Sequence, residues 1–176
     1  MANWPFRQGV HAIGDGIFGY VQPDGTWGWS NAGLVTSQGQ SLLIDTLMSV
    51  PLTREMLAAF AQVPGGARID RLVNTHANPD HFFGNGVVEG AEIIATAKTR
   101  AEMEGFNPQA LANLSANWRT MGEAGEFLFE TMGRYFDFSG VDELTLPTTT
   151  FEQSLALTVG DKTVELTDLG PAHTES

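Results

Sequence analysis

The feature that most constrains the fold is a polar hexapeptide that directly follows a β-type run. Residues 69–75 read Ile-Asp-Arg-Leu-Val-Asn-Thr, and residues 76–81 read His-Ala-Asn-Pro-Asp-His. In an extended loop, side chains at every second position point the same way, so His76, Asn78 and Asp80 can converge on one point. Imidazole and carboxylate groups in this arrangement, with His81 leaning to the other side, suit two neighbouring metal ions. The pattern therefore predicts a strand that ends at a metal site.

The same hexapeptide could form an ordinary polar turn, because Asn, Pro and Asp are common turn residues. The distribution of histidines favours the metal site instead. The chain has only four histidines, and two of them, His76 and His81, lie in this hexapeptide. A third, His173, again follows a strand-like run, whereas His11 has no partner residue near it in sequence and is predicted to be structural or exposed.

Composition limits the class of protein. A chain of 176 residues with 42% hydrophobic residues, 20 glycines and 8 prolines is long enough for one globular domain with a core. The absence of cysteine excludes disulfides and thiolate ligands, and a net charge of -12 argues against nonspecific binding of nucleic acid. No stretch resembles a membrane span or a signal peptide. We therefore expect a cytoplasmic protein that binds neither nucleic acid nor a membrane.

The pattern of apolar and turn residues predicts a layered α/β protein. A β meander is expected at residues 10–13, 16–21, 27–36 and 41–45, with a hairpin turn at Pro23-Asp24-Gly25. Helices are expected at residues 51–63 and 96–104. Further strands are expected before His76, at residues 92–95, and in a hairpin formed by residues 151–159 and 163–169.

Residues 107–138 are predicted to be mainly helical, within a helical insertion at about residues 105–140. Asn107-Pro108 is a typical helix start, and Gly122 is expected to end this first helix. The insertion could roof the metal loop and line an apolar pocket with its aromatic side chains, which are Trp118, Phe127, Phe129, Tyr135 and Phe136. Packing of two helices on the sheet would account for most of the same residues, and Trp27 and Trp29 are assigned to the core.

Three motifs together resemble the metallo-β-lactamase superfamily. Residues 75–81 resemble its His-x-His-x-Asp-His signature, residues 170–174 resemble its Gly-x-x-His-Thr turn, and residues 42–46 resemble its early hydrophobic strand ending in Asp-Thr. Their order and spacing agree over nearly the whole chain. The resemblance implies an α/β fold of the αββα sandwich type, of which this chain supplies the first sheet and the start of the second.

Two departures from the family pattern affect what is expected. Asn78 stands where the signature has its second histidine, and the family's later ligands, an aspartate and a histidine, would lie beyond His173. We therefore expect residues 1–176 to form a partial domain whose C-terminal part is missing. A C-terminal continuation or a companion chain would complete the fold, or a second copy of the chain would cover the exposed face.

The resemblance also assigns roles to individual residues. The implied metal ligands are His76, Asn78, Asp80, His81 and His173, and the implied cofactor is zinc, as one or two ions. His76, Asn78 and His173 would hold a first ion, and the other two a second. Asp80 would also orient the reacting water as a catalytic residue, and Asp45 would orient the metal loop through hydrogen bonds. Because an amide is a poorer zinc ligand than imidazole, Asn78 is expected to weaken the first site.

The function that the resemblance implies is a metal-dependent hydrolase in which a metal-bound hydroxide attacks a small-molecule substrate, an ester, thioester, lactone or lactam. Residues 1–176 alone are expected to be inactive. One alternative is an iron-dependent oxidoreductase similar to the persulfide dioxygenases of the same superfamily. Another is a catalytically silent binding module, which Asn78 and the missing ligands would favour. Zinc content would support the first interpretation, iron the second, and tight ligand binding without turnover the third.

Overall fold

The structure, a computed structural model, describes residues 7–22 and 26–176. Its main element is a seven-stranded sheet in the order β1-β2-β3-β4-β5-β6-β7. The first four strands form an antiparallel meander, and β4 to β7 run parallel to one another. The strands of this sheet are β1 (Gly9–Gly14), β2 (Ile17–Val21), β3 (Ala32–Ser37), β4 (Gln40–Ile44), β5 (Arg71–Val73), β6 (Glu92–Thr96) and β7 (Thr149–Phe151).

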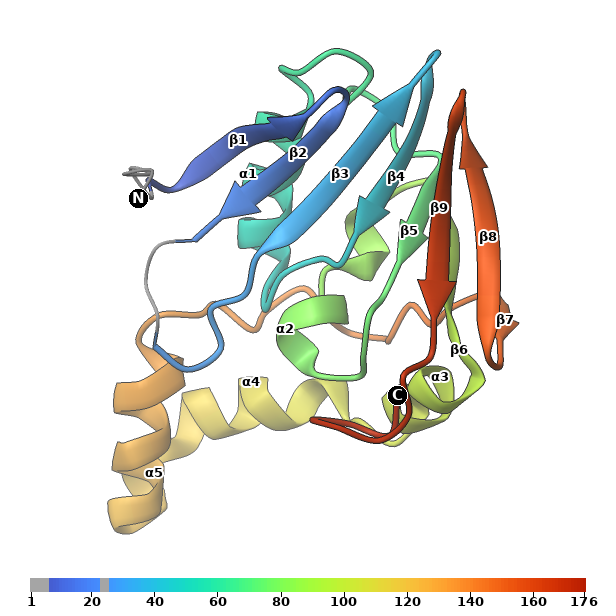
Figure 1. Cartoon of the computed structure of the whole chain (residues 1–176). Coiled ribbons are helices and arrows are strands. Elements are labelled where there is room, and N and C mark those ends of the chain that lie inside the picture. The colour runs from blue at the N-terminus through green and yellow to red at the C-terminus, as the bar shows by residue number, and fades with distance from the viewer. Residues whose placement is uncertain (1–6, 23–25) are drawn as a thin grey trace, which may run out of the picture.

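A second, two-stranded sheet consists of the hairpin β8 (Ser154–Val159) and β9 (Lys162–Thr167). Figure 1 shows this hairpin in front of the large sheet and helix α1 (Val50–Phe60) behind it. The start of α1 is set by Ser49, whose side chain accepts a hydrogen bond from the backbone N–H of Leu52, and by a proline in the first turn. The chain is thus layered, with the large sheet between a helix and a β hairpin.

The other helical elements lie after β5. They are α2 (Pro79–Phe82), η1 (Asn85–Val87), α3 (Ala97–Glu104), α4 (Pro108–Asn117), η2 (Trp118–Thr120), α5 (Gly122–Leu128) and the π-helical turn η3 (Phe129–Gly133). Figure 1 shows α5 projecting away from the two sheets. None of the helices within the described residues is long and apolar enough to cross a membrane.

Alternating residues of the central strands supply two separate cores. Leu34 and Leu43 face α1 and pack with Met56. Val35, the residue next to Leu34, faces the opposite way and packs with Leu157 of β8. Because side chains alternate between the faces of a strand, one apolar run can serve both cores. The predicted α/β sandwich fold is confirmed, and most predicted elements appear with small shifts of their ends.

One predicted strand is wrong in its first half. Residues 27–36 were expected to be extended, but β3 begins only at Ala32. Gly28 has a φ of +82° and lies against Phe136, so a Cβ at this position would come within 2.9 Å of that ring. A left-handed glycine turn packed under an aromatic ring therefore replaces the start of the strand. The turn expected at Pro23-Asp24-Gly25 lies outside the described residues.

The predicted strand at residues 151–159 is divided into two. Thr149–Phe151 forms β7, which pairs in parallel with β6 and completes the large sheet. The chain then crosses to the other layer, and only Ser154–Val159 forms the hairpin strand that pairs with β9. The apolar pattern is continuous across the break because Phe151 and Leu155 both pack in the core between the two sheets.

Candidate metal centre

The five predicted ligand residues are close together at the C-terminal ends of β5 and β9. His76 follows β5, and its ring centroid lies 4.1 Å from that of His81 and 5.5 Å from that of His173. Nδ2 of Asn78 lies 2.6 Å from Nε2 of His173, and Nε2 of His81 lies 3.3 Å from Oδ2 of Asp80. Residues almost one hundred positions apart in the sequence therefore form one polar cluster. Metal binding by this cluster stays a prediction.

The cluster differs from the expected extended loop in one respect. His81 was expected to point away from His76, but the two rings are neighbours. The reason is that Pro79 begins the short helix α2, with Asn78 as its N-cap, so the side-chain period changes from two residues to 3.6. Asp80 and His81 are therefore presented by a helical turn.

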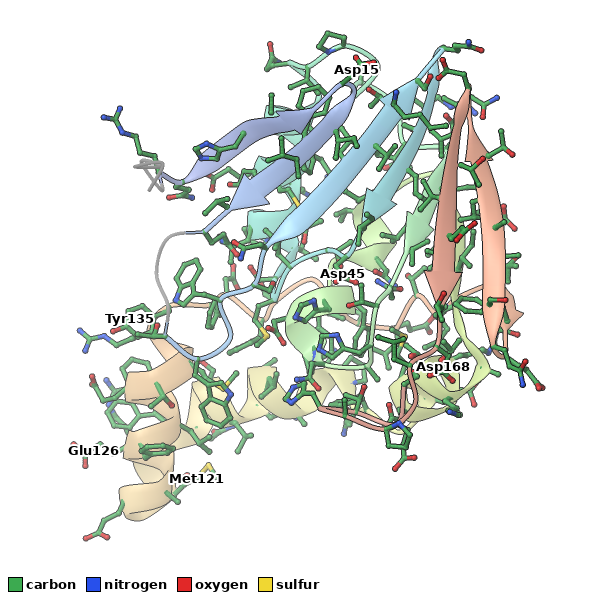
Figure 2. All side chains as sticks on the ribbon, in the orientation of Figure 1. Asp15, Asp45, Met121, Glu126, Tyr135 and Asp168 are labelled. Atoms are coloured by element: carbon green, nitrogen blue, oxygen red, sulfur yellow. The ribbon has the colours of Figure 1, made fainter. Side chains whose placement is uncertain are left out.

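Asp45 holds the cluster from the end of β4, as Figure 2 shows beside α2. Its Oδ1 accepts a hydrogen bond from the backbone N–H of Thr75 at 2.7 Å. Its Oδ2 lies 2.7 Å from Oγ1 of Thr75 and 2.9 Å from Nδ1 of His81. Asp45 has a φ of +62°, a conformation that aspartate tolerates better than most residues. The buried carboxylate thus fixes both the loop that follows β5 and one histidine ring.

These contacts also determine how His76 carries its proton. The hydroxyl of Thr75 donates to Asp45, which as a carboxylate can only accept. Nδ1 of His76 lies 2.9 Å from the oxygen of Thr75 and must therefore be the donor in that contact. The lone pair of neutral His76 is then on Nε2, the nitrogen left available for a ligand.

The pKa values of His76, Asp80 and His81 depend on the charges of their neighbours in the cluster. Burial lowers the pKa of His81, but hydrogen bonds and charge interactions with Asp45 and Asp80 outweigh it and raise that pKa to about 9. Burial raises the pKa of Asp80, but its hydrogen bond and charge interaction with His81 leave that pKa below its ordinary value. Burial and the neighbouring charge of His81 lower the pKa of His76. At neutral pH and without a metal ion, the raised pKa keeps His81 an imidazolium between Asp45 and Asp80, and the lowered pKa keeps the neighbouring His76 neutral.

The residues fit a metal ion in their chemistry. Three imidazoles and one carboxylate are a common set of zinc ligands. His76 and His81 each direct Nδ1 to an oxygen of the protein, as metal-bound histidines usually do. The side chains are hydrogen-bonded to one another, and across residues 7–22 and 26–176 no three His, Asp or Glu side chains are already arranged around a vacant ion position. An ion would replace the contacts of Asp80 with His81 and of Asn78 with His173.

The other residues singled out from the sequence lie apart from this cluster. His11 lies on β1, where its Nε2 is 2.7 Å from the backbone oxygen of Arg7. Trp27 is exposed rather than part of the core, whereas Trp29 packs against Phe136 with ring centroids 4.9 Å apart. Trp29 was thus correctly assigned to the core, and Trp27 was not.

The aromatic side chains of residues 107–138 have different surroundings: Phe136 packs against Trp29, and Phe127 and Tyr135 are exposed. Trp118 stacks on Phe129 at 4.4 Å, and Figure 2 shows Tyr135 on the segment that projects from the sheets. A cavity of about 550 Å³ is lined by Ala112, Ser115, Ala116 and residues 133–139, none of which belongs to the cluster. The segment is nevertheless anchored beside the metal loop, because Leu111 of α4 packs in the same apolar cluster as Ala77.

A buried polar network behind the cluster was missed by the sequence reasoning. Asn74 and Asn85 are 2% and 1% exposed, and Thr46 is fully buried between them and the end of β4. The available signal was the position of both asparagines directly after apolar runs, Leu-Val-Asn and Phe-Phe-Gly-Asn. A polar side chain at the end of a buried run requires a partner within the protein.

Comparison with known proteins identifies the family and the fold. The sequence model of the metallo-beta-lactamase superfamily matches residues 25–163, which is well over half of the chain. No curated protein sequence gives a significant match. Two solved structures share the fold: a metallo-beta-lactamase from Pontibacter korlensis, with a TM-score of 0.61 and 18% identity, and FIM-1 from Pseudomonas aeruginosa in its mono-zinc form, with a TM-score of 0.58 and 20% identity.

These alignments cover 96% and 97% of the present chain, respectively. They cover only 64% of the Pontibacter protein and 63% of FIM-1. The chain therefore spans less than two thirds of the length of either structure. At such low identity, the similarity concerns the fold.

Proposed function

The chain belongs to the metallo-β-lactamase superfamily, and from this premise we propose that it carries metal ligands and the water-orienting carboxylate of a metal-dependent hydrolase. The observation that carries the proposal is that His81 and His173, from two strand ends, both lie beside His76, and that Asp80 contacts His81. The proposed cofactor is zinc, as one or two ions. The similar FIM-1 structure is a mono-zinc form, which supports zinc as the first metal to test.

The proposed chemistry assigns distinct tasks to the residues. Zinc, when bound, supplies Lewis acidity that activates water near neutral pH. His76 offers Nε2 as a ligand because its Nδ1–H is engaged by Thr75. Asp80 keeps its ionised form, because its pKa lies below the ordinary value, and so can accept a proton from a reacting water. Asp45 keeps His81 oriented throughout. The proposed substrates are esters, thioesters, lactones or lactams, whose carbonyl carbon such a water can attack.

A silent binding module is a second candidate, and one contact favours it. The amide of Asn78 is hydrogen-bonded to Nε2 of His173, the nitrogen that would otherwise bind the first ion. An amide oxygen is a weak ligand for zinc. If this contact persists in the presence of metal, only the Asp80–His81 side of the cluster can bind an ion, and the protein can hold a ligand without hydrolysing it.

We also propose that further polypeptide, as a C-terminal continuation or a companion chain, covers the front of the large sheet. Ile17 lies opposite Val35 in the pairing of β2 with β3, so both side chains point to the face that carries the β8–β9 hairpin. Val35 is buried under the hairpin, whereas Ile17 is exposed. The fraction of the two related structures that the chain covers supports the same proposal.

The test is metal analysis and hydrolysis by the full gene product. After equilibration with equal zinc and iron, we expect zinc to be retained and at least one ester, thioester, lactone or lactam to be hydrolysed. His76→Ala should lower the zinc content and abolish hydrolysis, and His11→Ala, in the half-buried part of β1 and apart from the cluster, should change neither. Retention of iron with oxygen consumption would favour an oxidoreductase, and tight ligand binding without turnover would favour the silent module. Unchanged hydrolysis in H76A would contradict the proposed site.

A further inference from the structure

We propose that the buried amide pair Asn74–Asn85 is a positioning device that fixes α2, and with it Asp80 and His81, relative to the other ligands. This inference rests on the proposed function for its consequences in metal binding. Its structural content concerns the metal-free chain and can be tested there.

The two asparagines form a reciprocal pair. Nδ2 of Asn74 donates to Oδ1 of Asn85 at 3.1 Å, and Nδ2 of Asn85 donates to Oδ1 of Asn74 at 2.8 Å. Asn74 directly follows β5, and Asn85 begins η1, immediately beyond α2. The pair therefore connects the strand that leads into the metal loop with the segment that leaves it. Because both side chains are almost fully buried, no bulk water can replace these bonds if one is lost.

The pair also binds the backbone of His81 itself. The carbonyl oxygen of His81 accepts hydrogen bonds from Nδ2 of Asn74 at 3.0 Å and from the backbone N–H of Thr46 at 2.9 Å. Oγ1 of Thr46 lies 3.3 Å from the same oxygen and 3.2 Å from Oδ1 of Asn85. Helix α2 has only four residues, too few to satisfy its own carbonyls or to be stable alone. Its position must therefore be set by these external donors.

The arrangement holds His81 from both sides. At the end of β4, Asp45 contacts the ring of His81 and the adjacent Thr46 contacts its carbonyl oxygen. At the end of β5, Asn74 contacts that carbonyl, and the adjacent Thr75 contacts both Asp45 and the ring of His76. At each strand end, one residue (Asp45 or Thr75) thus contacts a histidine ring. The residue next to it in sequence (Thr46 or Asn74) contacts the backbone carbonyl of His81.

Besides the ends of β4 and β5 and the helical turn η1, the amide pair also contacts the loop before β7. Nδ2 of Asn85 also donates to the backbone oxygen of Thr145, in the loop before β7, at 3.0 Å. Amides suit this task because each offers two donors and an acceptor without charge, so the pair can bond to itself and to two carbonyls. A carboxylate at either position would lose the donors and bury a charge.

The test compares the double variant Asn74→Leu/Asn85→Leu with Ser41→Ala. Removing both amides together leaves no orphaned partner within the pair and keeps the number of side-chain heavy atoms and their branching. Ser41 is a matched control at the other end of β4. Its buried hydroxyl donates to the backbone oxygen of Arg68 at 2.6 Å and lies 2.9 Å from the backbone nitrogen of Asp70.

The first readout is the NMR signal of the Nδ1 proton that His81 shares with Asp45 in the metal-free chain. We expect the signal in the native chain and in S41A, and its loss or broadening in the double variant. The second readout is Co²⁺ affinity with the visible spectrum of the bound ion. We expect affinity to fall about tenfold to a hundredfold in the double variant, with a changed spectrum, and to stay native in S41A.

Each outcome has a defined meaning. A folded double variant that keeps the His81 signal and native Co²⁺ affinity would overturn the positioning role. If the native chain binds no Co²⁺ but its His81 signal depends on the amide pair, the proposed function fails and the positioning role stands. If the double variant does not fold, the single variant Asn74→Ala replaces it. That substitution removes the side-chain donor to the His81 carbonyl, and an unchanged His81 signal in N74A would equally overturn the inference.

Discussion

The two faces of the large sheet are covered unequally. On the side of α1, Leu34, Leu43 and Leu72 are completely buried in one continuous core. On the opposite side, the two strands β8 and β9 cover only part of the sheet, and Ile17 remains 38% exposed. The α1 face therefore contributes more apolar burial than the hairpin face, and more stabilisation, because hydrophobic stabilisation scales with the area removed from water.

The residues of the candidate metal centre come from both layers, but most of them come from the large sheet. His76, Asp80 and His81 are held by the ends of β4 and β5, which belong to the better-packed sheet. His173 follows β9 and comes from the thinner layer. The comparison implies a rigid group of ligands on one layer and a less constrained ligand on the other. Substitutions placed on each layer can test this difference.

The largest effect is expected from Leu43→Ala on the α1 face. Leu43 is fully buried, so the substitution should lower the free energy of unfolding by about 2–5 kcal/mol through lost burial and a residual cavity. The matched change Leu166→Ala, on β9, removes a half-buried side chain and should cost about 1 kcal/mol. Chemical denaturation of the two variants measures the difference. Equal losses would mean that the hairpin layer is as important to stability as the α1 face.

The next effect is expected from Asp45→Asn at the end of β4. The amide keeps one acceptor but loses the charge that binds Thr75 and His81, which should cost about 1.5–3 kcal/mol of unfolding free energy. Zinc affinity should fall roughly tenfold to a hundredfold because the orientation of His81 is lost.

Asp70→Asn is a suitable control for that variant. Asp70 accepts a hydrogen bond from the backbone N–H of Ser41 at 2.9 Å, at the opposite end of the same strand. The control should be destabilised without losing zinc affinity, as calorimetric titration of both variants would show. A similar fall in affinity for both variants would indicate general loosening of the sheet instead of a local role for Asp45.

A smaller effect is expected from Gly160→Ala at the tip of the β8–β9 hairpin. Gly160 has a φ of +61°, and a Cβ there would lie 2.4 Å from the backbone oxygen of Ser37. The backbone conformation alone should cost about 1–2 kcal/mol, and the tip must also move away from the β3–β4 turn. Hydrogen exchange should accelerate in β8 and β9 while amides of β4 and β5 stay protected.

The variant Gly39→Ala separates the cost of the backbone conformation from the cost of the steric contact with Ser37. Gly39 also has a positive φ, +76°, but nothing lies within 4 Å of its added Cβ. This variant should show the backbone cost without faster exchange in the hairpin. If both variants opened the hairpin equally, the close approach of its tip to Ser37 would not be what holds the two layers together.

The parts of the site that were predictable from sequence are those encoded by local pattern. The β run before His76, the aspartate after β4 and the later His173 were identified from short motifs. The placement of His81 was not, because it depends on the helix that Pro79 initiates. The Asn74–Asn85 pair could not be predicted either, since it forms only when the folded chain brings β5 and η1 together.

In the helical segment at residues 107–138, local sequence again predicted the ends of helices but not the contacts between distant side chains. Asn107-Pro108 correctly predicted the start of α4, where the side chain of Asn107 accepts a hydrogen bond from the backbone N–H of Gln109. Gly122 has a φ of +62° and does separate two helices, as expected, although it is assigned to the start of α5. The stacking of Trp118 on Phe129 was not predictable, because many aromatic pairings satisfy the same periodicity.

The smallest effect is expected from Ile17→Thr on the thinly covered face. Ile17 is partly exposed, and threonine keeps the β-branched shape that favours a strand. In the chain of residues 1–176, the free energy of unfolding should therefore change by no more than about 0.5 kcal/mol. In a protein that carries further strands over this face, the same substitution should cost about 1–2 kcal/mol, because an apolar contact would be replaced by a buried hydroxyl. Denaturation of both forms, with and without the substitution, gives the comparison. A loss well above 1 kcal/mol in the chain of residues 1–176 would show that this face is already closed by the chain itself or by a second copy, which measurement of its oligomeric state would distinguish.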